Sequence, residues 1–508
     1  MKIYSLYIEK YMKFEKQEII FNEFKEKTSL YQKELFGKMN INLFCGLNGS
    51  GKTSILSFIA IIFRYLQRYR ERIPCNYKIH YNITRKNNKF DIQISKIEQK
   101  IMISINGIES EIMKYDLKKG YIEDLNSNLK QVTYEEIQSY LPDKVIVLGF
   151  DLPYSKNKLN YGHNYKGDRL IEYVNINKVY RESEMGMDLS SGILDFFVFL
   201  KKNKNFMKIL KSLGFNFNWR IDIHFNFLNM LELNSFNSFY KKKFIETLDS
   251  DKFSKKKLIE DLLLTEYQKE RIKIYEEGLK KFDEIYYNEE FWKKKENGYI
   301  KEMKVDDVQI NLLKIFSNKK TLKAFKYLVK NNFIYINGYY LEKEKKEIAL
   351  NQMSTGEKSF LYYLFFIISR VTENSIVVWE EPETHLNKTW SRELITILSI
   401  LYKKCNVHFL ISSHETTMIN CLFSNQIKIL KETKIEFPDF ETFLVNENEI
   451  IFKFFGKDKP SFFENYIINI IEKSREEELE TLLNNIGDSF LKFLIYQKLH
   501  KGKNNVES

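Results

Sequence analysis

The segment that most constrains the fold is GLNGSGKTS, residues 46–54, which fits the pattern G-x-x-x-x-G-K-[ST]. It follows INLFC, which the apolar run predicts to be a short buried strand. It opens TSILSFIAIIFRYLQRY, whose apolar residues recur at helical spacing. In this strand–loop–helix context, glycines let backbone N–H groups turn inward onto phosphate oxygens, and the helix N-terminus adds partial positive charge. A glycine-rich turn without a ligand is the alternative, but the context favours a phosphate-binding loop.

Two side chains of this loop have specific predicted roles. Lys52 is expected to bridge the terminal phosphates of a nucleotide, and the Thr53 hydroxyl is expected to bind Mg²⁺. The other candidate nucleotide-binding residues of the loop are Asn48, Gly49, Ser50, Gly51 and Ser54.

The segment SIVVWEEPETHL, residues 375–386, is an apolar run that ends in two adjacent carboxylates. Like charges that close raise each other's pKa, so an opposing positive charge is expected in front of them. In proteins with such a loop, a neighbouring buried strand ends in an acid that holds Mg²⁺, and the next residue polarises the attacking water. Glu380 is therefore the predicted metal ligand and Glu381 the predicted catalytic base. An exposed acidic turn is the alternative.

Two later segments are candidate nucleotide-site residues because of their order along the chain after the first two motifs. Ser354, Thr355, Gly356 and Glu357 precede an apolar helix, where a serine and free N–H groups can face an anion. An ordinary capping box from Ser354 to Glu357 explains the same residues. The apolar run VHFLISSH ends in His414, which can contact a terminal phosphate, although a single histidine at a strand end is more often structural.

The order of these four motifs resembles the ABC-type ATPase head of the RecF/SMC/OLD group. The resemblance covers roughly residues 1–150 and 330–420, and EEPETHL is similar to that group's Asp-Glu-Pro-Glu-x-His-Leu. It implies an α/β P-loop NTPase fold that binds ATP and Mg²⁺. It also implies an ATPase in which Lys52, Glu381 and His414 are catalytic.

The same resemblance assigns Ser354–Glu357, hereafter the signature segment, to the ATP of a partner subunit. ATP would then join a homodimer or a higher oligomer, and hydrolysis would release it. One departure is Glu380, which stands where the group has Asp and is longer by one methylene. We therefore expect slow turnover, with ATP acting as a conformational clamp more than as a fuel.

Four parts of the chain differ in pattern. Residues 1–150 are predicted to form an ATPase lobe with an antiparallel β meander, including a hairpin at the Asn-Gly pair 106–107. Residues 151–330, rich in Lys, Glu, Phe, Leu and Tyr, are predicted to be a helical insertion. Residues 331–455 form the second ATPase half, beginning with a hairpin in FIYINGYYLE, and residues 456–508 form a helical tail.

The composition indicates which cellular compartment and which kinds of partner to expect. Four cysteines without paired spacing suit a reducing cytoplasm and no structural metal. No stretch of eighteen apolar residues occurs, so no membrane span is expected. The net charge of +12 over 508 residues fits a polyanionic partner such as DNA, but also a Lys-, Asn- and Ile-rich composition with solvated lysines.

The resemblance favours a cytoplasmic ATPase of the OLD-like or Septu- and PARIS-like type, the sensor or scaffold subunit of an antiphage or restriction-linked system. No H-N-H or clustered Asp-x-Asp set is evident, so a separate nuclease or toxin is the expected effector. The alternative is a RecF-like repair or recombination ATPase that binds DNA. A transporter subunit fits poorly because of the long insertion.

Overall fold

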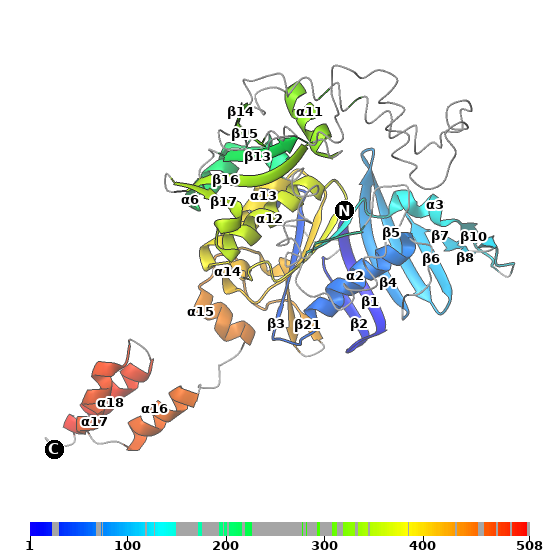
Figure 1. The fold of residues 1–508 in the computed structure, drawn as a ribbon. Coiled ribbons are helices and arrows are strands. Elements are labelled where there is room, and N and C mark those ends of the chain that lie inside the picture. The colour runs from blue at the N-terminus through cyan, green and yellow to red at the C-terminus, as the bar shows by residue number, and fades with distance from the viewer. Residues whose placement is uncertain are drawn as a thin grey trace, which may run out of the picture. The chain divides into compact units, whose positions relative to one another are not determined.

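A computed structural model describes the chain as two units, Met1–Leu444 and Val445–Ser508, and each is described here by itself (Figure 1). The described residues are 1–22, 30–67, 73, 75–116, 119–125, 127–148, 171–174, 193–196, 198–200, 203–215, 219–225, 277, 281, 292–294, 307–311, 319–330, 334–343, 346–384, 386–431, 434–455, 462–473, 476–487 and 490–504.

A seven-stranded sheet in the order β12-β11-β18-β19-β3-β20-β21 organises the first unit. All of its neighbouring strands are parallel except β20 and β21. Its central strands are almost wholly apolar and buried, as expected for a parallel sheet covered on both faces. The strands are β3 (Asn40–Gly46), β11 (Val145–Leu148), β12 (Ile171–Val174), β18 (Ile376–Glu380), β19 (His408–Ser412), β20 (Ile427–Lys431) and β21 (Lys434–Glu436).

A second seven-stranded sheet, in the order β10-β7-β6-β5-β4-β1-β2, is antiparallel apart from the β10–β7 pair. Its strands are β1 (Lys2–Tyr11), β2 (Phe14–Ile20), β4 (Tyr77–Arg85), β5 (Asn88–Ile97), β6 (Lys100–Ile105), β7 (Ile108–Ile112) and β10 (Lys130–Val132). Between β6 and β7, Asn106 and Gly107 have φ of 50° and 86°, the backbone that a two-residue hairpin of this twist requires. The predicted meander and its hairpin are confirmed.

Helix α2 (Lys52–Gln67) lies between these two sheets (Figure 1). It packs on β3, β11, β18 and β19 of the parallel sheet. On the other side Phe58 and Phe63 meet Tyr77 and Tyr81 of β4, with ring centroids 6.1 and 5.5 Å apart in edge-on geometry. One apolar core therefore runs from the antiparallel sheet through α2 to the parallel sheet, and it fixes the loop that opens α2.

Helices α12 and α13 of the first unit pack on the parallel sheet. Tyr363 of α12 packs against Trp379 of β18, and Tyr402 of α13 packs against Phe409 of β19, with tilted rings whose centroids are 4.7 and 5.5 Å apart. Besides α2, the helices described in this unit include α1 (Leu30–Phe36), α3 (Tyr134–Ile137), α6 (Lys204–Ser212), α11 (Lys319–Lys330), α12 (Thr355–Arg370), α13 (Lys388–Tyr402) and α14 (Thr416–Ile419).

The segment 151–330 is not helical throughout. Besides α6 and α11, its described residues include β12, which joins the parallel sheet, and three strands of a five-stranded sheet in the order β14-β15-β13-β16-β17. That sheet consists of β13 (Trp219–Phe225), β14 (Trp292–Lys294), β15 (Asp307–Asn311), β16 (Ile334–Lys343) and β17 (Lys346–Ala349). Outside this segment, β8 (Lys114–Asp116) and β9 (Gly120–Ile122) form a separate two-stranded sheet. In WRIDIHF, polar and apolar residues alternate, a strand period that the surrounding helical composition obscures.

The hairpin predicted in FIYINGYYLE is wrong. β16 continues through the Asn337-Gly338 pair, and its pairing with β13 shifts register there, from Asp222 opposite Gly338 to Ile223 opposite Ile336. Asn337 is thus the extra residue of a β-bulge. The chain turns back later, between β16 and β17.

The second unit is helical: α15 (Glu447–Ile450), a π-helical turn (Ile451–Phe455), α16 (Phe462–Lys473), α17 (Glu476–Asn485) and α18 (Phe490–Asn504). Ile471, Leu479 and Ile495 form its small apolar core. It begins near residue 445, earlier than the predicted tail boundary of 456. In the part of the chain that the structure describes, no helix is long and apolar enough to cross a membrane.

Candidate active site

The carboxyl ends of β3, β18 and β19 lie side by side and bring three of the predicted motifs together. In the strand register Glu380 pairs with Ser412, which pairs in turn with Phe44 of β3. Beyond the strands, the Glu381 N–H donates to the Ser412 carbonyl at 2.9 Å and the Ser413 N–H to the Phe44 carbonyl at 3.0 Å. The loop after β3, the paired glutamates and the loop after β19 therefore share one edge of the sheet, where ligands of such sheets bind.

The loop after β3 requires its glycines. Gly49 and Gly51 have φ of 74° and 102°, in the left-handed region that side chains disfavour. A β-carbon on Gly51 would lie 2.5 Å from the Lys13 Cε and 2.6 Å from the Phe14 Cζ, because the β1–β2 turn packs directly on the loop. Around Gly49 no atom lies within 4 Å of such a carbon.

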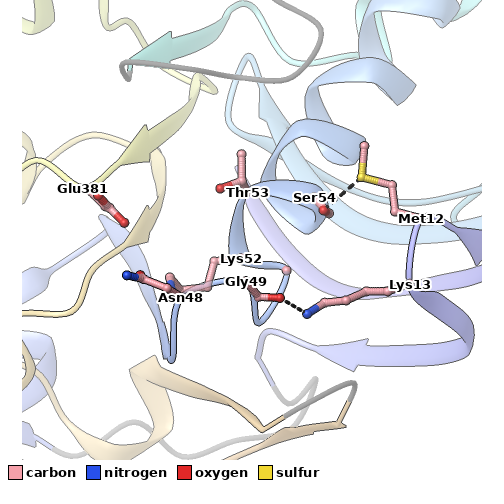
Figure 2. A pocket seen from close by; sticks show the side chains of 9 residues that line it. Met12, Lys13, Asn48, Gly49, Lys52, Thr53, Ser54 and Glu381 are labelled. Atoms are coloured by element: carbon pink, nitrogen blue, oxygen red, sulfur yellow. Dashed lines mark hydrogen bonds between the residues drawn. The ribbon is translucent and has the colours of Figure 1, made fainter.

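A pocket of about 370 Å³ opens between the loop, the β1–β2 turn and β18 (Figure 2). It is lined by Met12, Lys13, Asn48, Gly49, Gly51, Lys52, Thr53, Ser54 and Glu381. Figure 2 shows Glu381 on one side and Met12 and Lys13 on the other. Ser50, a predicted nucleotide-binding residue, does not line the pocket, and its side chain is buried.

The β1–β2 turn is a wall of the pocket that sequence reasoning missed. The Lys13 ammonium donates to the Gly49 carbonyl, and the Ser54 hydroxyl lies 3.1 Å from the Met12 sulfur. Burial lowers the pKa of Lys13. Nothing in YMKF resembles a phosphate-binding motif, so only the three-dimensional packing on Gly51 reveals this contribution.

Lys52 is held at the base of the pocket. Its ammonium donates to the carbonyls of Gly46 at 2.8 Å and Leu47 at 3.2 Å, and lies 2.8 Å from His414 Nε2. Burial lowers the pKa of Lys52, and the negative charge of Glu381 partly offsets that effect. The opposing positive charge expected in front of the glutamate pair is therefore present.

The two adjacent carboxylates have different partners, which limits their mutual repulsion. Glu380 accepts a hydrogen bond from the Thr53 hydroxyl, whereas Glu381 Oε1 lies 3.3 Å from His414 Nε2. The hydrogen bond with His414 lowers the pKa of Glu381, and the charge of Lys52 acts in the same direction. Glu381 has φ of 42°, a costly conformation for a side-chain-bearing residue that is typical of functional sites.

Glu383 is a further residue of this site that sequence reasoning did not single out. Its Oε1 accepts hydrogen bonds from the Ser413 hydroxyl at 2.6 Å and from the His414 N–H at 2.9 Å. It thereby ties the loop after β18 to residues 413–415, hereafter the switch loop. Burial raises the pKa of Glu383. The only sequence signal was a third acid in EEPE.

The signature segment lies apart from this pocket, since none of its residues lines it. Ser354 caps α12: its hydroxyl donates to Glu357 Oε2 at 2.8 Å and accepts from the Glu357 N–H at 3.4 Å. The capping box proposed as the alternative interpretation is thus present. Thr355 and Gly356 occupy the first turn, with Thr355 exposed. Glu357 also forms an ion pair with Lys343 of β16.

Thr53 and Glu380 fit the needs of a magnesium ion bound to a nucleotide. Mg²⁺ usually takes only one or two protein oxygens and completes its octahedron with phosphate and water. The Thr53 hydroxyl and the Glu380 carboxylate are in direct contact, so two such oxygens are adjacent. Within the described ranges no group of three or more His, Cys, Asp or Glu side chains forms a separate metal site.

Part of this chain matches a family of known proteins. Residues 204–420 match the family described as "AAA domain, putative AbiEii toxin, Type IV TA system". That match begins after the phosphate-binding loop and contains the signature segment, the glutamate pair and His414. No curated protein matches the chain.

Solved structures similar to this chain include SMC head domains. The head domain from Pyrococcus furiosus bound to the C-terminal domain of ScpA has 12% identity and a TM-score of 0.35, covering 87% of this chain and 96% of that one. The SMC head domain from Thermotoga maritima has 8% identity and a TM-score of 0.31, covering 87% and 100%. Similarities with TM-scores this low carry no weight for function.

The assignment of the fold follows from the sheet and the loop themselves, together with the family match. A parallel sheet carries the phosphate-binding loop after β3, the glutamate pair after β18 and a histidine after β19, and an antiparallel sheet covers α2. The chain therefore has an α/β fold of the P-loop NTPase type, and residues 204–420 are similar to the AAA family named above.

Proposed function

We propose that the protein binds Mg-ATP and hydrolyses it slowly as a nucleotide-gated homodimer. The observation that carries this proposal is the convergence of Lys52, Thr53, Glu380, Glu381 and His414 on one edge of the parallel sheet. Each has the chemistry that phosphoryl transfer to water requires: a fixed cation, two metal ligands, a base and a second polar contact.

Each side chain has a distinct proposed task. Lys52 exchanges its carbonyl and histidine contacts for the terminal phosphates. Thr53 and Glu380 hold the magnesium ion, which when bound neutralises developing charge on the phosphates. Glu381, kept ionised by its lowered pKa, accepts the proton of the attacking water. The water oxygen bonds to the terminal phosphorus while the bond to the ADP oxygen breaks.

His414 supports this base. Its Nε2 lies close to both Lys52 and Glu381, so it accepts from Lys52 when it carries no proton and donates to Glu381 when protonated. Either hydrogen bond holds the imidazole ring beside Lys52 and Glu381, where the terminal phosphate is proposed to bind. A phosphate oxygen that displaces Lys52 from the ring would make His414 sensitive to the presence of the terminal phosphate.

The position of the signature segment supports a dimer. Ser354–Glu357 begins α12 at a partly exposed helix N-terminus and does not line the pocket of its own chain. A helix N-terminus attracts an anion, and the terminal phosphate of a second copy is the anion that the ABC-type arrangement offers once the Ser354 cap turns toward it. ATP would then be shared between the loop of one chain and the signature segment of the other.

The biological setting proposed is an antiphage or restriction-linked system in which a separate nuclease or toxin acts as effector. The description of the matching family, "AAA domain, putative AbiEii toxin, Type IV TA system", supports a defence-linked setting, but it does not bear on whether the effector is a separate chain. The alternative is a RecF-like ATPase that binds DNA, with which the net charge of +12 is compatible. Strong loss of DNA binding between low and physiological salt, together with DNA-stimulated hydrolysis, would support the alternative.

The test of the ATPase assignment is nucleotide binding and hydrolysis by purified protein. Wild type should bind Mg-ATP, and Lys52→Ala should not, while Lys10→Ala, at an exposed lysine of β1, should bind like wild type. We expect kcat below the usual enzyme median of about 10 s⁻¹. The absence of ATP binding by wild type, or equal binding by Lys52→Ala, would refute the proposal.

A further inference from the structure

The signature segment contains a charge that conflicts with its proposed ligand. Glu357 lies in the first turn of α12, where its carboxylate bonds to the hydroxyl and N–H of Ser354. A fixed negative charge beside a triphosphate site opposes binding of the triphosphate. For this turn to accept an anion, the negative charge of Glu357 must be compensated by a nearby cation.

Lys343, the last residue of β16, supplies the opposing charge. Its ammonium forms an ion pair and hydrogen bond with Glu357 Oε1, while Ser354 occupies Oε2. The pair is sheltered, since the side chains of Lys343 and Glu357 are 30% and 13% exposed. Shelter of this kind makes an ion pair stronger than it would be in open solvent.

The ionisation of Glu357 depends on these contacts. Burial alone raises the pKa of Glu357, but the hydrogen bonds from Lys343 and Ser354 outweigh burial and leave the pKa below its ordinary value. At neutral pH the carboxylate is therefore charged, and Lys343 compensates that charge. When Ser354 turns its hydroxyl toward a phosphate, Lys343 remains as the partner that holds Glu357.

We propose that Lys343 is a positioning residue for nucleotide-dependent dimerisation: it neutralises Glu357 so that the signature segment can receive the partner's triphosphate. This inference rests on the proposed dimer. Lys343 ends β16, so the five-stranded sheet supplies the charge that compensates Glu357. The role requires charge compensation, so removing the charge of Glu357 should make Lys343 dispensable.

The experiment uses the 508-residue chain with Glu381→Gln, which we expect to retain bound ATP because its base is removed. Dimerisation with Mg-ATP is measured by sedimentation velocity over a range of protein concentrations. Adding Lys343→Met should weaken dimerisation at least about tenfold, because each of the two sites then carries an uncompensated charge. ATP affinity at concentrations where the chain is monomeric should be unchanged, since Lys343 does not line the pocket.

Rescue separates charge compensation from simple structural damage. Glu357→Gln combined with Lys343→Met should restore dimerisation, as should Lys343→Arg in place of Lys343→Met. Lys346→Met, at an exposed lysine of β17, is the matched control and should dimerise like the Glu381→Gln parent.

Two results would overturn the inference alone: a parent dimer that Lys343→Met leaves unchanged, or a loss that Glu357→Gln does not rescue. Failure of the Glu381→Gln parent to dimerise with Mg-ATP would instead overturn the proposed function, and the inference with it. The parent measured first therefore distinguishes the two failures.

Discussion

Replacing Glu383 tests whether the loop after β18 orients the switch loop. Glu383→Ala removes the acceptor of two hydrogen bonds, from the Ser413 hydroxyl and the His414 N–H. Bonds to a charged acceptor contribute about 1.5–3 kcal/mol each. Burial of the carboxylate, which raises its pKa, offsets part of that gain, so we expect a net loss of about 2 kcal/mol in the free energy of unfolding.

The same change should slow hydrolysis more than it weakens ATP binding. His414 contacts Lys52 and Glu381 through its ring, and loosening its backbone misplaces that ring. We expect kcat to fall about tenfold to a hundredfold, with the Kd for ATP within about threefold of wild type. Urea unfolding and steady-state kinetics measure the two effects.

Glu383→Gln is the matched control, because its carbonyl oxygen can accept both bonds without a charge. Its kcat should stay close to that of wild type. Since the folded-state pKa of Glu383 is raised, the cost of its ionisation appears as pH rises above the ordinary value of 4.5. The stability of Glu383→Gln relative to wild type should therefore increase with pH in that range. Unchanged kcat in Glu383→Ala would refute the reasoning.

Four further substitutions probe the pocket. Lys52→Ala should weaken ATP binding by at least about a hundredfold in titration calorimetry, because a buried cation is lost. Gly51→Ala, whose new carbon would lie 2.5 Å from a side chain of the β1–β2 turn, should lose ATP binding and at least about 2 kcal/mol of stability; Gly49→Ala, with open space around it, should lose only about 1 kcal/mol. Because a hydrogen bond with His414 lowers the pKa of Glu381, the acidic limb of the kcat profile should lie below pH 4.5, and His414→Ala should move it upward.

The sequence predicted those structural elements that are determined by residues close together along the chain. The strand–loop–helix at residues 40–67 and the hairpin at Asn106-Gly107 follow from short-range backbone preferences and apolar spacing. The second Asn-Gly pair, at 337–338, carries the same signal but lies in a long strand. There β13, more than a hundred residues earlier, supplies a partner on both sides of the pair, and a bulge absorbs the extra residue.

The parts of the site that sequence missed depend on contacts between distant segments. Glu383 meets Ser413 of the switch loop thirty residues later, and Lys13 reaches Gly49 from a separate sheet. Lys343 meets Glu357 fourteen residues later, beyond β17. None of these pairings has a sequence period or motif. The first arises because parallel strands bring their carboxyl ends together, and the second because the β1–β2 turn packs on the glycine-rich loop.

The most direct test of a shared nucleotide is the mass of Glu381→Gln in solution, measured by light scattering with and without Mg-ATP. The account predicts a monomer without nucleotide and a stable species of twice the chain's mass with Mg-ATP. Adding Ser354→Arg, which blocks the signature segment, should return the protein to a monomer that still binds ATP. An ATP-bound monomer in Glu381→Gln, or a dimer indifferent to Ser354→Arg, would contradict it.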